Sequence, residues 1–315
     1  MSHARAVRRA LIALAAAGAL AISVGCTAGP APSASVTASA PSANWDELGP
    51  IVYAQGKDTS GTAKAQVAEW NKANPSEQVE LRELSESTDE QRDAMVERAK
   101  NKSGEFAVMA IDVVWTTEFA ANGWLQELPS DRFPTAGYLK AAVDSGTYFD
   151  KLYAMPSTSD GALLYYRKDL LDKAGLQPPT TWAELQTACD KVLPSQDGMS
   201  CYGGQFDKYE GLTSNVAEAI SSAGGSILNA QGQASVNSPE ALAGLSWIVD
   251  GFTSGRIPAE AKTWQEEQSR AAFQSGKLLF LRNWPYMYEL AGKDDRVAGR
   301  FAVAPLPGKD GPGVS

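Results

Sequence analysis

Acidic and aromatic residues stand at the ends of apolar segments in this 315-residue chain. Asp112 comes directly after the apolar run 106–111, and Trp284 follows the run 278–281 within Asn283-Trp284-Pro285. A carboxylate that accepts hydrogen bonds from a ligand contributes about 1.5–3 kcal/mol for each bond. An aromatic ring adds roughly 0.5–1.5 kcal/mol by stacking. Such residues could hold a ligand that has both hydroxyl groups and apolar faces.

Histidine is missing from the part of the chain that follows the N-terminal segment. The single histidine, His3, lies in a stretch that we expect to be removed on export. Its loss excludes Ser-His-Asp and Cys-His catalysis and removes the commonest metal ligand. The pairs Gly203-Gly204 and Gly224-Gly225 lack the Lys-Ser/Thr context of a phosphate loop. We therefore expect no cofactor, no metal and no catalytic residue.

The elements that must position these side chains alternate between strand and helix. The pattern predicts strand 51–54, a helix that Asn74-Pro75 ends, a strand around 79–81, helix 88–100 and strand 106–111. This βαβαβ order predicts a doubly wound parallel sheet with 106–111 as a central strand. Ligands bind beyond the carboxyl ends of such strands, which singles out the loops 55–60 and 112–115.

Helix boundaries are marked clearly further along the chain. Gly175 ends a predicted helix at 169–174, Thr181 and Glu184 form a predicted capping box, and Ser238-Pro239 opens another helix. Strands are predicted at 153–155, 161–166 and 278–281.

The N-terminus reads as an export signal. Three arginines precede the apolar run 10–24, which is shorter than the roughly 20 residues that a membrane span needs. The run ends in Ser23-Val24-Gly25-Cys26, which resembles a lipobox, so residues 1–25 form the predicted signal peptide and Cys26 the predicted lipidated residue. Residues 26–44 read as the lipidated cysteine and a flexible linker, and folding is expected to begin at Trp45. A plain secretory signal is the alternative.

The net charge limits the classes of binding partner, and the cysteines predict a disulfide bond. Removing a signal with three arginines and no acid takes the formal charge from −9 to −12, which argues against nucleic acid or anionic lipid. After Cys26 only Cys189 and Cys201 remain. In an exported protein they are expected to pair, with about 3 kcal/mol of stabilisation. Two buried free thiols are the alternative.

The order of motifs resembles the extracellular solute-binding lipoproteins of ABC sugar importers, in the trehalose- and maltose-type branch. The resemblance runs from about Ile51 to Gly311. It rests on the following segments: Met109-Ala110-Ile111-Asp112-Val113-Val114-Trp115, Gly123-Trp124, Lys151-Leu152-Tyr153-Ala154-Met155-Pro156, Leu164-Tyr165-Tyr166-Arg167-Lys168-Asp169-Leu170-Leu171, Tyr209-Glu210-Gly211-Leu212, Ser222-Ala223-Gly224-Gly225, Ala272-Phe273, Gly276-Lys277 and Asn283-Trp284-Pro285.

The resemblance implies an α/β, two-lobed fold of the type II periplasmic-binding-protein kind with a cleft between the lobes. Lobe I would comprise 45–157 and 266–307. Lobe II would comprise 158–265 and be completed by residues after Ser315, because family members are longer. The chain would cross between the lobes twice.

The resemblance also implies where the sugar is held. The expected ligand-binding residues are Asp58, Asp112, Trp115, Asp160, Glu210, Glu266, Trp284 and Tyr286. Several have a structural alternative: Asp112 could cap a helix, Trp115 could belong to the core, and Glu210 could compensate a helix dipole. The neighbouring Glu267 leaves the assignment of Glu266 open.

The predicted protein is a monomeric, lipid-anchored, extracytoplasmic component of an ABC transporter. It would capture a disaccharide such as trehalose or maltose and deliver it to the permease subunits in the membrane. An exported glycosidase with paired carboxylates, for example Asp112 and Glu266, is the main alternative. A lipoprotein scaffold or sensor that binds no sugar is another.

Overall fold

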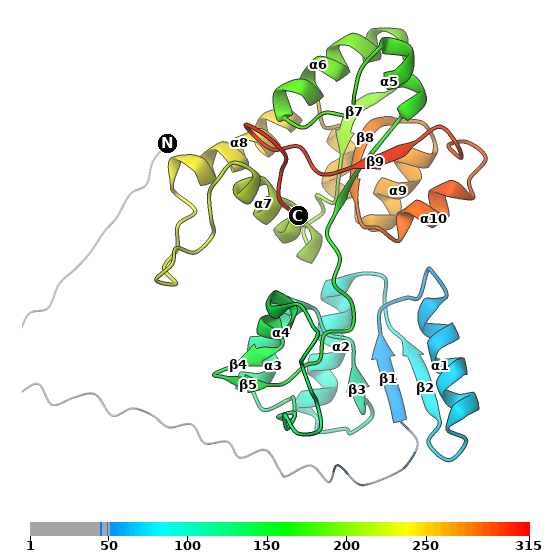
Figure 1. Ribbon diagram of the computed structural model, residues 1–315, viewed down its shortest axis with the longest axis vertical. Coiled ribbons are helices and arrows are strands. Elements are labelled where there is room, and N and C mark those ends of the chain that lie inside the picture. Colours follow the sequence, from blue (N-terminus) through cyan, green and yellow to red (C-terminus); the bar gives the residue numbers. More distant parts are fainter. Residues whose placement is uncertain (1–44, 46–48, 50) are drawn as a thin grey trace, which may run out of the picture. The chain divides into compact units, whose positions relative to one another are not determined.

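The computed structural model describes Trp45, Gly49 and residues 51–315 (Figure 1). The predicted signal peptide, the lipidated Cys26 and most of the linker lie outside the described residues. The described chain forms two lobes in succession, each with its own sheet: lobe I up to residue 152 and lobe II from residue 163. Residues 153–162 connect them without forming helix or strand. Nowhere in 51–315 does a helix combine the length and apolarity needed to cross a membrane.

Lobe I is built on a parallel sheet of three strands in the order β2-β1-β3. Strands β1 (Ile51–Gln55), β2 (Val79–Glu83) and β3 (Val108–Met109) alternate with helices α1 (Thr62–Ala73) and α2 (Thr88–Lys100). The predicted βαβαβ order is therefore confirmed. The expectation that 106–111 forms a central strand is wrong: β1 is central, β3 lies at the edge, and Val108 is 48% exposed. A short apolar run does not reveal how many neighbours a strand has.

The remainder of lobe I covers this sheet and completes its core. A 3₁₀ turn (Val113–Trp115) leads into α3 (Thr116–Ala121), followed by α4 (Lys140–Ser145) and the antiparallel hairpin of β4 (Thr147–Tyr148) and β5 (Lys151–Leu152). The core centres on Met95, Val96, Trp115 and Phe119.

Lobe II contains a mixed sheet in the order β7-β8-β6-β9. Every residue of β8 (Leu278–Asn283) is buried. This strand pairs in parallel with β7 (Ser200–Gly203) and antiparallel with β6 (Leu163–Tyr166), and β6 also pairs with β9 (Ala302–Ala304). The helices of this lobe are α5 (Lys168–Ala174), α6 (Trp182–Val192), α7 (Glu210–Ser222), α8 (Pro239–Thr253), α9 (Glu266–Gln274) and α10 (Met287–Gly292).

The segment 266–307 differs from its predicted place. It was expected to cross back and complete lobe I, but β8 and β9 pair here with the lobe II strands β6 and β7. Glu266 accordingly begins a helix inside lobe II instead of lying at a second crossover. The apolar sequence of β8 predicts a buried strand. Which strands it pairs with depends on contacts with residues that are distant in the sequence.

Local signals were more reliable. Thr181 Oγ1 accepts a hydrogen bond from Glu184 N at 3.1 Å, and the Glu184 side chain accepts one in return from Thr181 N, so the predicted capping box is confirmed. Gly175 ends α5 with a φ of 66°, a conformation that glycine adopts at little cost. Cys189 and Cys201 are joined by a disulfide bond, with their Cα atoms 5.4 Å apart.

Candidate functional site

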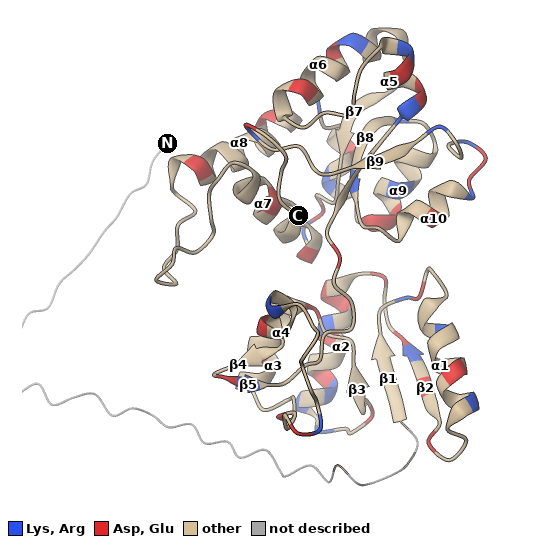
Figure 2. Ribbon diagram, viewed as in Figure 1, with Lys and Arg blue, Asp and Glu red and all other residues tan. Residues whose placement is uncertain are grey.

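A polar cavity of about 180 Å³ lies where loops of lobe I face the start of α9 in lobe II. Its lining consists mainly of amides, carboxylates and hydroxyls, with one phenol and one lysine. The residues are Gly56, Lys57, Thr59, Glu86, Thr88, Gln91, Gln265, Glu266, Glu267, Gln268 and Tyr286. Figure 2 shows acidic residues at the starts of α7 and α9. Such a lining suits a neutral ligand with many hydroxyl groups better than an apolar one or an anion.

The lobe I side of the cavity is formed by the loop after β1 and the start of α2. A Cβ at Gly56 would lie 2.5 Å from Nε2 of Gln91, so the absent side chain lets the loop approach the helix closely. Thr88 begins α2, and its hydroxyl oxygen is buried without a hydrogen-bond partner among the described residues.

The lobe II side places two neighbouring carboxylates differently. Glu266 accepts a hydrogen bond from the Tyr209 hydroxyl at 2.8 Å and from the Trp284 indole N–H at 3.3 Å. Glu267 accepts one from the Tyr286 hydroxyl at 2.7 Å and pairs with Arg270. Both carboxylates therefore border the cavity, and each fixes one of the two aromatic candidates.

Trp284 is held from several directions. The guanidinium carbon of Arg282 lies 3.9 Å from the centre of its ring, and Asn283 Oδ1 accepts a bond from its backbone N–H at 2.7 Å. Its backbone carbonyl accepts a bond from the Tyr165 hydroxyl at 2.9 Å. Trp284 does not line the cavity itself but stands behind Glu266 and is only partly buried.

Glu210 and Asp112 do not line the polar cavity, but both have a raised pKa. Burial raises the pKa of Glu210 to about 7, and the neighbouring carboxylates of Asp112 and Glu266 contribute to the rise. The Ser214 hydroxyl donates to Glu210 at 2.8 Å and favours the charged form. Burial also raises the pKa of Asp112 above its usual value. Desolvation disfavours a charged carboxylate, so both acids gain from a ligand that donates hydrogen bonds to them.

Three predicted residues take other positions. Asp58 accepts hydrogen bonds from Lys64 N and the Ser60 hydroxyl, as expected of a residue that organises the turn before α1. Trp115 is 5% exposed and stacks on Phe119 in the lobe I core. This placement favours its structural alternative, because little ring surface is left for a ligand. Asp160 lies exposed in the connecting segment.

The buried network behind Trp284 was missed by sequence reasoning. Arg282 is fully buried and is held by the Glu218 carboxylate, with Nε 2.8 Å from Oε2, and by the side-chain carbonyl of Gln205 at 2.7 Å. Gln205 in turn donates to the Ser269 hydroxyl at 2.8 Å. The one available signal was an arginine directly after four apolar residues, since a buried charge requires a partner.

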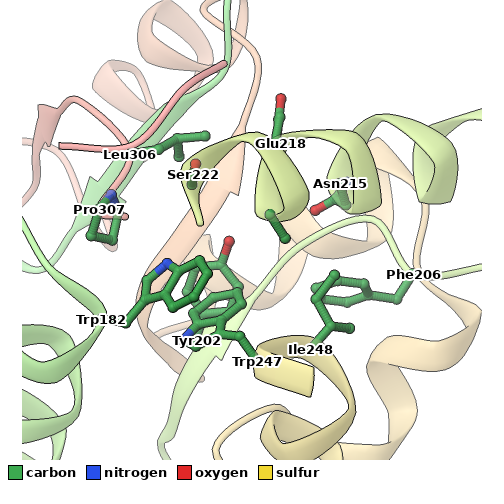
Figure 3. Close-up of a pocket in the computed structure, with 11 residues that line it drawn as sticks. Trp182, Tyr202, Phe206, Asn215, Glu218, Ser222, Trp247, Ile248, Leu306 and Pro307 are labelled. Atoms are coloured by element: carbon green, nitrogen blue, oxygen red, sulfur yellow. The ribbon is translucent and has the colours of Figure 1, made fainter. Parts of the chain in front are cut away.

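A second, smaller cavity lies wholly within lobe II (Figure 3). Trp182 and Trp247 stack with their ring centres 4.9 Å apart, and Tyr202, Asn215 and Glu218 contribute further side chains. At about 20 Å³ it has room for a single water molecule. It is therefore too small to hold a sugar.

Comparisons with known proteins identify the family and the fold. Residues 53–314 match the family model described as bacterial extracellular solute-binding protein. A probable ABC transporter-binding protein of Deinococcus radiodurans is 39% identical over 222 residues, which are 67% of this chain and 51% of the relative. The chain thus spans about half the length of that relative.

Two solved structures share the fold. The maltose-bound MalE3 of T. maritima superimposes with a TM-score of 0.76 at 33% identity, covering 82% of this chain and 68% of that one. A solute-binding protein of Thermotoga lettingae with bound α-D-tagatose gives a TM-score of 0.73 at 24% identity, covering 84% and 69%.

Proposed function

Because the chain belongs to the family of bacterial extracellular solute-binding proteins, we propose that the full-length protein captures a neutral sugar outside the cytoplasm for an ABC importer. Its fold is the two-lobed, type II periplasmic-binding-protein fold of its structural neighbours. Proteins with this fold bind a ligand between their lobes and close around it by a hinge motion. Binding without chemistry is the proposed role.

One observation carries the choice of a hydroxyl-rich ligand. The cavity is lined mainly by carboxylates, amides, the hydroxyl residues Thr59 and Thr88 and the phenol of Tyr286, with Lys57 as its one cation. A sugar hydroxyl both donates and accepts, so it can accept from a side-chain amide while donating to a carboxylate such as Glu266. The maltose bound by MalE3 supports a disaccharide, and trehalose is equally compatible with this lining.

The delivery step is part of the same proposal. A sugar that contacts both lobes shifts the protein toward its closed form in proportion to its differential affinity for that form. The closed protein would then dock on the permease subunits, with Cys26 as a lipid anchor that keeps it at the membrane surface. Both parts are proposed from the family and from the N-terminal sequence.

A thermal-shift screen of the full-length protein against neutral sugars, polyols and sugar acids tests this function. A true ligand at 100 times its Kd adds about 2.7 kcal/mol to the free energy of unfolding, whereas sugar acids should give no shift. Calorimetry should then show that Thr88→Val and Glu266→Gln weaken binding of the selected sugar. Trp70→Ala, at an exposed tryptophan of α1, serves as the control and should bind normally.

Two outcomes would contradict the proposal. A complete screen without a saturable shift would favour a scaffold or sensor that binds no sugar. Release of glucose during incubation with maltose or trehalose would favour the glycosidase.

A further inference from the structure

One face of the Trp284 indole is covered by Arg282. The Arg282 guanidinium lies over the ring at 3.9 Å from its centre, and Arg282 itself is fully buried. Trp284 as a whole is only partly buried, although it also packs against the lobe II core. A ligand that stacks on Trp284 must therefore use the face opposite Arg282.

Arg282 is itself fixed by a residue that lies away from the polar cavity. Glu218 of α7 binds the guanidinium through both carboxylate oxygens, a bidentate geometry that defines the plane of the charged group. Gln205 supplies a third contact at 2.7 Å. A guanidinium held at this many points cannot rotate without losing paired hydrogen bonds in a buried environment.

Glu218 lines the small cavity of lobe II and not the polar cavity. Its side chain is 13% exposed and lines that cavity together with Tyr202, Trp182 and Trp247 (Figure 3). It is absent from the lining of the polar cavity, which contains Glu266 and Tyr286. Contacts thus run from the small cavity through Glu218 and Arg282 to the covered face of Trp284.

From these contacts we infer that Glu218 is a positioning residue for sugar binding. It orients Trp284 through Arg282 without touching the ligand. A guanidinium against an aromatic face is attractive, and more so when both are shielded from water. Fixing the ring before the ligand arrives spares the binding step the cost of ordering a rotatable side chain. The inference rests on the proposed function, because it assumes that a ligand uses Trp284.

Glu218→Gln is the sharpest perturbation. Glutamine has the same length and retains one carbonyl oxygen for Arg282, but its amide end repels the guanidinium. The matched control is Asp169→Asn, which makes the same change in the Arg167–Asp169 pair of the same lobe. If the buried charge left by Glu218→Gln prevents folding, Glu218→Asp takes its place in the same measurements, because aspartate keeps the negative charge but is too short to hold Arg282 in the same position.

The first measurement needs no ligand. In protein labelled with 5-fluorotryptophan, the Trp284 resonance is identified by its loss in Trp284→Phe. Glu218→Gln should shift or broaden this resonance, and Asp169→Asn should leave it unchanged. An unchanged Trp284 resonance in Glu218→Gln overturns the inference, whatever the protein binds.

The second measurement is a double-mutant cycle on sugar affinity by calorimetry. Glu218→Gln should weaken binding about tenfold in the wild-type background but less than about twofold in the Trp284→Phe background, because contacting residues are coupled. Equal losses in both backgrounds would mean that Glu218 acts only by supporting the fold, and would refute the positioning role. A wild-type protein that binds no sugar refutes the proposed function instead, and the fluorine spectrum still decides the inference.

Discussion

Replacement of Glu210 by glutamine should change how the stability of the protein depends on pH. Burial raises the pKa of this carboxyl from 4.5 to about 7 in the folded protein. Between these two values the folded state keeps the proton that the unfolded state has released. Stability therefore falls as the pH rises through this window, and the full penalty is present above about pH 7.

The size of the effect follows from the same two values. A pKa difference from 4.5 to about 7 corresponds to roughly 3 kcal/mol. Because Glu210 is partly exposed, solvent screens part of this, and we expect about 1–2 kcal/mol. Glutamine cannot ionise but can still accept the hydrogen bond from Ser214. Glu210→Gln should therefore gain this amount over the wild type between pH 5 and pH 8.

Urea unfolding at intervals from pH 5 to pH 8.5 measures this difference. Glu240→Gln is a suitable control because Glu240 is also a first-turn acid, on α8, but is exposed. The control should run parallel to the wild type, offset only by the lost helix-dipole interaction, which Glu210→Gln also loses. If Glu210→Gln also runs parallel to the wild type, the carboxyl of Glu210 is not desolvated and the reasoning fails.

Three further changes test other parts of the molecule. Replacing both Cys189 and Cys201 by serine should lower the free energy of unfolding by about 3 kcal/mol. A reductant should destabilise the wild type by the same amount and leave this variant unchanged. A reductant without effect on the wild type would contradict the expectation. Thr181→Ala should cost about 1 kcal/mol in thermal unfolding by removing the capping box, whereas Thr187→Ala within the same helix should cost less. Cys26→Ser should move the protein from the membrane fraction to the soluble exported fraction, and retention at the membrane would exclude Cys26 as the anchor.

Features encoded by neighbouring residues were predictable. The end of α1 at Asn74, the limits of α2 and the capping box of Thr181 depend on side chains within one helical turn of the feature. The carboxyl-end loop 55–60 was identified from strand order, and three of its residues line the polar cavity. Glu266 and Tyr286 were named in advance and line the same cavity.

Features that depend on distant partners were not predictable. The sequence of β8 predicts a buried strand, but nothing within it specifies pairing with β6 and β7 of lobe II. Thr88 was taken only as the start of a helix, because its unpartnered hydroxyl is visible only after folding. Arg282 finds Glu218 across 64 positions, a separation at which residue spacing carries no signal.

The connecting segment has a consequence for how the two lobes depend on each other. Within the described chain each sheet is assembled from a continuous stretch of sequence, and residues 157–160 of the connection are exposed. A protease that cuts there would break no strand pairing in either lobe. The cavity proposed to bind the sugar, by contrast, is lined by residues from both sides of that cut. A nicked protein is therefore expected to keep two folded halves and to bind the sugar only while the halves stay together.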